Sequence, residues 1–190
     1  GTITIADYAF EACCELTNLT IPDSLISIGE YAFCYCEYLT SITFGKSVTT
    51  IGDSAFHNCN GLIDLVIPDS VTTIGLESFS CCYNLKNVTI GNGITKISDF
   101  AFFCCESLTN VTIGNSVTTI GDSAFAHCYD LINITIPNRV TTIGYGAFFE
   151  CYNLTDVYYG GLKKQWNDVD IDSENDPLLN ADIHFAVVTS

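Results

Sequence analysis

The sequence repeats itself every 23 residues up to about Gly161, and this period constrains the fold more than any other feature. An isoleucine, a phenylalanine, a cysteine and a leucine each recur at a fixed place in the unit. The phenylalanine positions are Phe10, Phe33, Phe56, Phe79, Phe102, Phe125 and Phe148. A fixed period of this length without insertions is typical of a solenoid, in which each unit buries its apolar face against its neighbours.

The composition argues against several classes of function. Although 48% of the residues are hydrophobic, they are evenly dispersed, and no run approaches the roughly 18 residues that would span a bilayer. The chain carries 22 Asp and Glu against 6 Lys and Arg, a net charge of −16. Nucleic acids attract cationic side chains, so the acidic charge predicts no nucleic-acid partner. The lack of a long apolar run predicts no membrane insertion by this chain.

Each repeat contains two short extended segments and a turn. The segment from Leu85 to Ile90 has the alternation and β-branched residues of a strand, and a proline or glycine follows it in every repeat. A second extended piece runs over 117–121 in the repeat that follows. A turn follows this piece in each repeat. In the repeat that contains Asp53, the apolar residues up to Leu62 predict a short helix or 3₁₀ turn with Asp53 as its N-cap.

The boundaries of the repeats divide the chain into two parts. We assign residues 1–161 to seven 23-residue repeats, truncated at the N-terminal end, and residues 162–190 to a C-terminal capping segment. Thr2-Ile3-Thr4-Ile5 aligns with Val48-Thr49-Thr50-Ile51, so the chain starts within a repeat. Solenoids need polar caps over their terminal repeats. We therefore expect further repeats or a cap, and any signal peptide, upstream in a longer parent protein.

The repeat resembles a known one. Pro68-Asp-Ser-Val-Thr-Thr-Ile-Gly75 and Ala124-Phe-Ala-His-Cys-Tyr-Asp-Leu131 match the pattern of the BspA-type leucine-rich repeat, which covers residues 2 to about 161. The tail is similar to the closing segment of bacterial members at Val157-Tyr-Tyr-Gly, Gln165-Trp166-Asn167 and Asn180-Ala-Asp-Ile-His184. The resemblance implies a right-handed leucine-rich-repeat solenoid, rich in strand, with a parallel β-sheet and short helical or 3₁₀ turns.

The same resemblance implies a function. Proteins of this kind are cell-surface or secreted proteins of host-associated bacteria, with relatives in parasitic protists, and several act in adhesion. It therefore predicts a non-catalytic module without a cofactor that binds a protein or glycan ligand on host or neighbouring cells. The alternative is a structural spacer or stalk that presents another domain.

The strand face that a solenoid exposes as a concave surface is the first candidate for binding. By the alternation of strand side chains, two residues of each repeat point outward from this sheet. The candidate binding residues are Asn18, Thr20, Ser41, Thr43, Asp64, Val66, Asn87, Thr89, Asn110, Thr112, Asn133, Thr135, Asp156 and Tyr158. These ladders of Asn and Thr are equally consistent with a purely structural role, because Thr favours strands and stacked Asn amides satisfy one another.

Aromatic residues that the repeat does not require form a second candidate surface. Their place beside the Ala-Phe pair or after the cysteine puts them on the irregular side of the solenoid, where they would either recognise a ligand or pack over neighbouring repeats. They are Tyr8, Tyr31, Tyr35, Tyr38, Tyr83, Phe100, Phe103, Tyr129, Tyr145, Phe149 and Tyr152.

Alternating carboxylates in the tail suggest a weak calcium candidate at Asp168, Asp170 and Asp172. Ser173 stands where an EF-hand loop needs glycine, and Leu179 stands where it needs a bidentate glutamate. The other interpretation is a polar end cap in which the apolar residues between the acids pack on the last repeat.

The remaining reactive residues favour packing over chemistry. Seven of the eleven cysteines occupy one repeat position, where parallel side chains would hold the Cβ atoms wider than a disulfide prefers. We expect them to be buried free thiols that pack as small hydrophobes. His57, His127 and His184 lack the partners of a catalytic triad in the sequence, so we predict that they decorate the surface and that the chain is not an enzyme.

Overall fold

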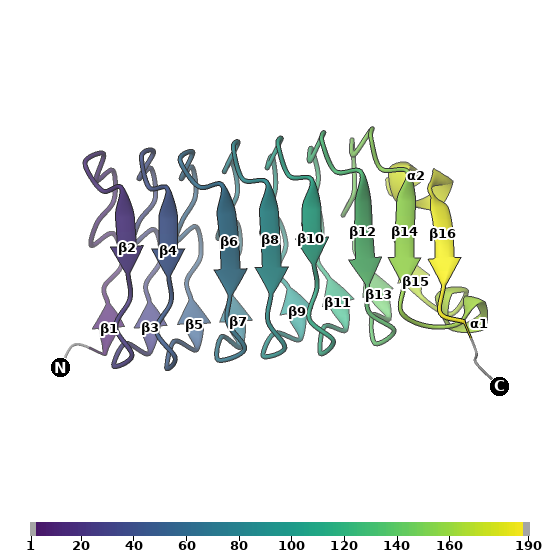
Figure 1. The fold of residues 1–190 in the computed structure, drawn as a ribbon, viewed down its shortest axis with the longest axis horizontal. Coiled ribbons are helices and arrows are strands. Elements are labelled where there is room, and N and C mark those ends of the chain that lie inside the picture. The colour runs from purple at the N-terminus through teal and green to yellow at the C-terminus, as the bar shows by residue number, and fades with distance from the viewer. Residues whose placement is uncertain (1–2, 188–190) are drawn as a thin grey trace.

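The computed structural model describes residues 3–187, which form a solenoid whose turns stack along one axis (Figure 1). We call each turn of the chain a rung. Each rung contributes one strand to a front sheet and a shorter strand to a rear sheet. A turn segment joins the rear strand to the next front strand, and these segments line the upper edge in Figure 1, which we call the turn ridge.

The front sheet is parallel and keeps the repeat register from rung to rung, so that Asn110 lies beside both Asn87 and Asn133. Its hydrogen-bonded order is β2-β4 in one part and β16-β14-β12-β10-β8-β6 in the other. The front strands are β2 (Asn18–Thr20), β4 (Ser41–Thr43), β6 (Asp64–Ile67), β8 (Asn87–Ile90), β10 (Asn110–Thr112), β12 (Asn133–Ile136), β14 (Asp156–Tyr159) and β16 (Asp182–Phe185).

The rear sheet is also parallel and is divided into β1-β3-β5-β7 and β15-β13-β11-β9. Each of its strands has two residues, of which the second points into the core in the interior rungs. The rear strands are β1 (Thr4–Ile5), β3 (Ser27–Ile28), β5 (Thr50–Ile51), β7 (Thr73–Ile74), β9 (Lys96–Ile97), β11 (Thr119–Ile120), β13 (Thr142–Ile143) and β15 (Asp170–Ile171).

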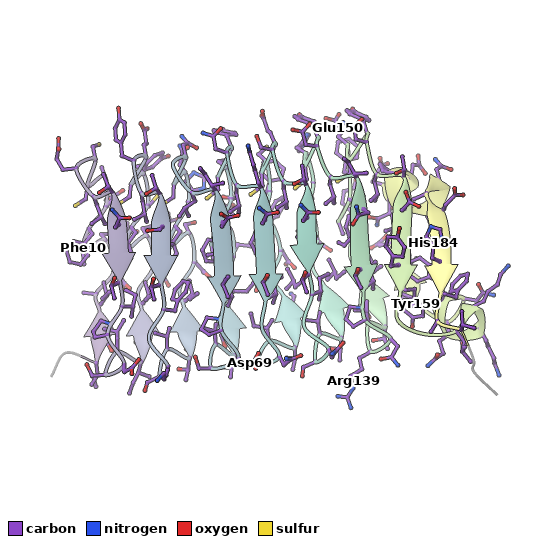
Figure 2. All side chains as sticks on the ribbon, in the orientation of Figure 1. Phe10, Asp69, Arg139, Glu150, Tyr159 and His184 are labelled. Carbon is purple, nitrogen blue, oxygen red and sulfur yellow. The ribbon has the colours of Figure 1, made fainter. Side chains whose placement is uncertain are left out.

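One continuous core runs along the solenoid axis between the sheets and the turn ridge. The repeated phenylalanines from Phe33 to Phe148 are fully buried, and their rings stack on one another with centroids 5.2–5.7 Å apart. Phe10 begins this column and is 45% exposed (Figure 2). The expected inward stripe of Ala55, Phe56, Cys59 and Leu62 is confirmed, because all four side chains are buried.

The turn ridge differs from the sequence expectation, because its segments are not helical. Successive backbone amides there bond alternately within the same rung and to the next rung. The Cys34 N–H donates to the Tyr31 carbonyl at 3.1 Å, whereas the Phe33 N–H donates to the Ala55 carbonyl of the next rung at 2.8 Å. This alternation needs left-handed backbone at two positions per turn, such as Tyr31 (φ 53°) and Tyr35 (φ 59°). In a helix every amide would donate to a carbonyl of the same segment, which would leave none for the next rung. The bonds between rungs therefore take the place of a helix.

The role predicted for the aspartate is also corrected. Asp53 does not cap its own turn. Its Oδ1 accepts the amide of Leu76 in the next rung at 2.8 Å, and Asp122 accepts the amide of Tyr145 at 2.9 Å. The side chain therefore ties two rungs together where a sequence motif suggested a local contact.

A glycine follows the rear strands β3, β5, β7, β11 and β13 and sets how closely the rungs approach there. A Cβ on Gly75 would lie 2.4 Å from the Asp53 nitrogen, and one on Gly121 would lie 2.7 Å from the Asp99 nitrogen. Both distances are too short for a real side chain. The glycine amides donate to the isoleucine one rung earlier, as Gly121 does to Ile97 at 2.9 Å.

Ser98 occupies this glycine position and coincides with the break in the rear sheet. Its hydroxyl donates to the Ile74 carbonyl at 2.5 Å, which takes the place of the amide bond made by the glycines. Strands β7 and β9 on either side are not hydrogen-bonded to each other. The nearby Phe79 and Phe102 rings have centroids 5.7 Å apart, the widest spacing among the stacked phenylalanines from Phe10 to Phe148. A Cβ at this position would crowd the previous rung, as one on Gly75 or Gly121 would, and this accounts for the break between β7 and β9.

The tail completes both sheets and closes the C-terminal end of the core. Strand β15 pairs with β13 and β16 pairs with β14, while α1 (Lys163–Trp166) and α2 (Asp176–Asn180) lie at opposite edges of the last rungs (Figure 1). Trp166 and Leu178 are buried, and Val169 and Ile171 pack against the core. This arrangement agrees with the end-cap interpretation of the tail.

Asn175 replaces a missing rung. In the earlier rungs the phenylalanine amide donates to a backbone carbonyl of the next rung, which belongs to Ser78 for Phe56 and to an alanine for the others, but the Phe148 amide donates to Asn175 Oδ1 at 3.0 Å. The Asn175 Nδ2 donates in turn to the Gly144 and Asp172 carbonyls, each at 2.9 Å. Asn175 is only 1% exposed, so one buried amide satisfies backbone groups that repetition satisfies elsewhere.

Gly121→Ser should introduce between β9 and β11 the break that Ser98 makes between β7 and β9. We expect a loss of about 1–3 kcal/mol in unfolding free energy, because the new Cβ overpacks the rung contact. Urea unfolding measures the change. Gly146→Ser is the matched control, since its nearest neighbour is 3.4 Å away and Ser54 and Ser123 hold the same left-handed conformation. An equal loss in both variants would contradict the close-approach explanation.

Asn175→Ala should loosen the cap by leaving the Phe148 amide unpaired. We expect a loss of about 1–3 kcal/mol in unfolding free energy, the usual range for an unsatisfied buried group. Amide hydrogen exchange at Phe148 should accelerate in the same variant, because its N–H donates to Asn175. Asn115→Ala, an exposed position, serves as the control and should stay within about 0.5 kcal/mol of the parent. Unchanged exchange at Phe148 would show that Asn175 does not hold this rung.

Candidate functional site

The front sheet brings the candidate binding residues onto one face. Positions such as Asp64 and Val66 in β6 are exposed, whereas Leu65 and Ile67 between them are buried. The register aligns the outward residues into two columns, which we call the amide column (Asn18, Ser41, Asp64, Asn87, Asn110, Asn133, Asp156) and the hydroxyl column (Thr20, Thr43, Val66, Thr89, Thr112, Thr135, Tyr158). Within these columns only Asn133 and Asp156 are half-buried.

The amide column largely satisfies its own hydrogen bonds. Asn87 Nδ2 donates to Asp64 Oδ1 at 2.6 Å, and Asn110 Nδ2 donates to Asn87 Oδ1 at 2.8 Å. Ser41 Oγ donates to Asn18 Oδ1 at 2.7 Å in the N-terminal rungs. These bonds between rungs give the column a structural role that does not depend on a ligand.

The hydroxyl column is different. In the part of the chain that the structure describes, the hydroxyls of Thr89, Thr112 and Thr135 have no protein hydrogen-bond partner. They are exposed and lie on neighbouring rungs of one sheet. Their donors and acceptors are therefore directed to solvent and available to a bound molecule.

The tail extends both columns by one rung, which the sequence analysis missed. Strand β16 places Asp182 beside Asp156 and His184 beside Tyr158. The His184 ring, labelled in Figure 2, belongs to the last front strand. It stacks on Tyr158 with centroids 4.7 Å apart, and its Nε2 lies 2.7 Å from Asp156 Oδ1. This hydrogen bond, with a second from Thr155, holds the pKa of Asp156 below its usual value. The alternation of polar and apolar residues in Asp182–Phe185 could have predicted this strand. The 23-residue period could not, because the tail does not repeat.

The aromatic residues of the turn ridge pack over neighbouring rungs and also reach solvent. Tyr8 stacks on Tyr31 at 5.0 Å and Tyr129 on Tyr152 at 6.1 Å. Tyr8 and Tyr152 nevertheless remain 53% and 69% exposed. Packing over neighbouring rungs is therefore confirmed for these pairs, whereas ligand recognition by the exposed ring faces stays a prediction.

The histidines are more closely partnered than their isolated positions suggest. His127 lies 2.9 Å from Glu150 and its ring meets Phe103 and Phe149 edge to face. His57 Nδ1 lies 2.5 Å from Ser80 Oγ, and partial burial lowers the pKa of His57. Ser80 is only 1% exposed, so this pair cannot present a nucleophile to a substrate.

The tail carboxylates proposed as a calcium candidate are not gathered into a site. Asp170 lies in β15, and Asp172 Oδ1 accepts the Ser173 amide at 2.7 Å. Across residues 3–187, no group of three or more His, Cys, Asp or Glu side chains is placed to hold a metal ion. Within the same range, no helix is long and apolar enough to cross a membrane.

The repeated cysteines are free thiols with a consistent hydrogen bond. Each from Cys36 to Cys151 donates its S–H to the phenylalanine carbonyl one rung earlier, as Cys105 does to Phe79 at 3.3 Å. All eleven cysteines are unbridged. Burial raises the pKa of Cys82 and of Cys151 to about 12. A neutral thiol is the form that donates this bond, so the column is chemically inert at neutral pH.

Comparisons with known proteins agree with this architecture. The family model for the BspA type leucine rich repeat region (6 copies) matches residues 3–129 and again residues 51–168. A leucine-rich repeat protein from Bacteroides ovatus ATCC 8483 has a similar structure, with a TM-score of 0.76 and 33% identity over 85% of this chain and 44% of that one. This chain thus spans less than half the length of the B. ovatus protein.

A second solved structure is similar over almost the whole chain. The leucine rich repeat protein of T. pallidum matches with a TM-score of 0.75 and 28% identity, covering 98% of this chain and 80% of that one. No curated protein matches the sequence.

The buried thiols predict a loss of stability at alkaline pH. A thiol in the unfolded chain ionises at about pH 8.5, whereas Cys82 and Cys151 keep their protons to about pH 12. Between these values the folded state binds more protons, so the unfolding free energy should fall as pH rises. The stabilisation is complete below about pH 8.5 and disappears as pH approaches about 12.

Urea unfolding at about pH 8 and about pH 10.5 tests this expectation. The Cys82→Ala/Cys151→Ala variant should lose less stability than the parent between the two pH values, because two of the titrating groups are absent. Parallel losses in parent and variant would assign the alkaline effect to other groups.

Proposed function

The chain belongs to the BspA-type leucine-rich repeat proteins, and on that premise we propose that it is a non-catalytic binding module that recognises macromolecules on host or neighbouring cells. Leucine-rich repeats are commonly surfaces for protein interaction, and solenoids provide extended faces for it. We further propose that it acts in adhesion, at the cell surface or as a secreted protein, in a host-associated bacterium.

The observation that carries this proposal is the in-register hydroxyl column of the front sheet. Thr89, Thr112 and Thr135 present hydroxyls at successive rungs, and these hydroxyls have no hydrogen-bond partner within residues 3–187. A rigid array of this kind loses little conformational entropy when a ligand binds, because its side chains stand on paired strands. A partner with regularly spaced donors and acceptors, such as a protein strand or a glycan chain, fits it best.

The C-terminal end of the column offers the best anchor for such a partner. Tyr158 is 45% exposed and is fixed by stacking on His184, which Asp156 orients. Aromatic rings that are rigid before binding are the usual high-energy contacts of interfaces. Hydroxyls would position the partner along the sheet and the aromatic pair would hold one end of it.

Binding to immobilised extracellular-matrix proteins, plasma proteins and glycans tests the proposal, with each panel measured at low and high salt. We expect a saturable interaction that Tyr158→Ala weakens at least about tenfold, in the range of an interface anchor residue. Tyr145→Ala is the matched control, because Tyr145 is 50% exposed but lies on the turn ridge. It should leave the affinity unchanged.

Other outcomes redirect the assignment. An interaction that both tyrosine variants leave intact would remove the front sheet from the proposal. No specific binding to any panel would favour the spacer or stalk function.

A further inference from the structure

A pocket of about 380 Å³ lies where the turn ridge meets the cap. It is formed between the turn of the last repeat and helix α2, at the end of the ridge where Figure 2 labels Glu150. Its floor and walls include Phe149, Leu154 and Pro177. This volume falls within the range of small-ligand pockets, and no repeat position generates it, because only the last turn faces the cap.

The polar groups around this pocket are acidic. Glu150, Glu174 and Asp176 line it, and no Lys or Arg does. Glu174 and Asp176 are exposed and, within residues 3–187, form no ion pair. The lysines of α1, Lys163 and Lys164, lie at the opposite edge of the solenoid (Figure 1). The carboxylates of Glu174 and Asp176 therefore face solvent, and no cationic side chain of residues 3–187 is paired with them.

Aromatic groups stand beside these carboxylates and are held in place by neighbours. Tyr152 is 69% exposed and stacks on Tyr129. The Tyr152 hydroxyl donates a hydrogen bond to the Glu150 carboxylate, and this bond raises the pKa of Tyr152. Glu150 itself is fixed by His127 at 2.9 Å, and Phe149 packs against the same histidine. Ring faces and carboxylates around an apolar floor are the chemistry that receives an organic cation.

Two other occupants fit less well. A metal ion needs several ligands converging on one point, and no such group exists among the residues that the structure describes. A purely apolar group would leave the Glu174 and Asp176 carboxylates, which form no ion pair among residues 3–187, without a counter-charge beside it. A long alkyl chain with a terminal ammonium satisfies both parts, since its methylenes cover the apolar wall and its charge reaches the carboxylates.

We propose that this pocket binds a lysine side chain of a protein partner. The inference rests on the proposed binding function and adds to it a second contact with stated chemistry. Because pocket and front sheet share the last rungs, one partner could use both. The carboxylates would select for positive charge, and Phe149, Tyr152 and Pro177 would contact the methylenes.

The peptide acetyl-Gly-Lys-Gly-amide, titrated into the ¹⁵N-labelled chain, tests the pocket. We expect saturable amide shifts at Phe149, Tyr152 and Asn180, and none from the norleucine peptide, which has the alkyl chain without the ammonium. The double variant Glu174→Gln/Asp176→Asn should lower the affinity for the lysine peptide by at least about fivefold, the change expected for removing two surface charge pairs. The unfolding midpoint of this double variant should match that of the parent, since neither side chain has a hydrogen-bond or ion-pair partner among residues 3–187.

Glu11→Gln/Glu15→Gln is the matched control. It makes the same change in net charge at exposed acids of the first rung and should leave the affinity within about twofold. Equal weakening by both double variants, or shifts spread over the whole acidic surface, would reduce the effect to general electrostatics and overturn the proposal. Equal shifts from the norleucine peptide would do the same.

The two proposals fail separately. A macromolecular interaction that Tyr158→Ala weakens and Glu174→Gln/Asp176→Asn leaves intact would overturn the pocket and retain the binding function. Lysine-peptide binding at the pocket without any macromolecular hit would retain the pocket and overturn the front-sheet proposal.

Discussion

The close, in-register approach of neighbouring rungs is the constraint on which the rest of this structure depends. Backbone groups on the sheets and on alternate residues of the turn ridge bond to the next rung, so every rung must follow nearly the same path. This requirement explains the glycines whose missing Cβ would collide with the previous rung, and the phenylalanine rings that stack from rung to rung with centroids 5.2–5.7 Å apart. It also explains why one serine, Ser98, opens the rear sheet.

The same constraint separates structural from functional residues. Side chains that point inward are repeated because each fills the same space beside its neighbour, and the cysteine column shows this most clearly, with a thiol that bonds the previous rung. Outward side chains have no such requirement. The differences between rungs therefore collect on the front sheet and turn ridge, where Tyr158, His127 and Glu150 stand, and these are the surfaces on which the proposed binding rests.

Three features exist only where the repeats meet the C-terminal tail: the buried Asn175, the added His184 and the acidic pocket. Asn175 supplies with one side chain the bonds that a further rung would supply with its backbone. The same tail adds His184 to the front sheet through the parallel strand β16 and forms the acidic pocket beside α2. Both features join residues from the last repeat to residues of the cap, so they belong to the junction and to neither part alone.

The period by itself determined the solenoid, the parallel sheets, the inward columns and the face on which the candidate residues lie, because equal spacing in sequence becomes equal position in space when rungs stack. Only the tertiary structure decided how Asp53 and Tyr31 are used. Their partners lie in the next rung, and a local motif does not show a bond made across rungs. For the same reason the Tyr158–His184 pair and the pocket at Glu150 could not be predicted from spacing: they arise where the aperiodic tail meets the last periodic turn, and packing alone sets that contact.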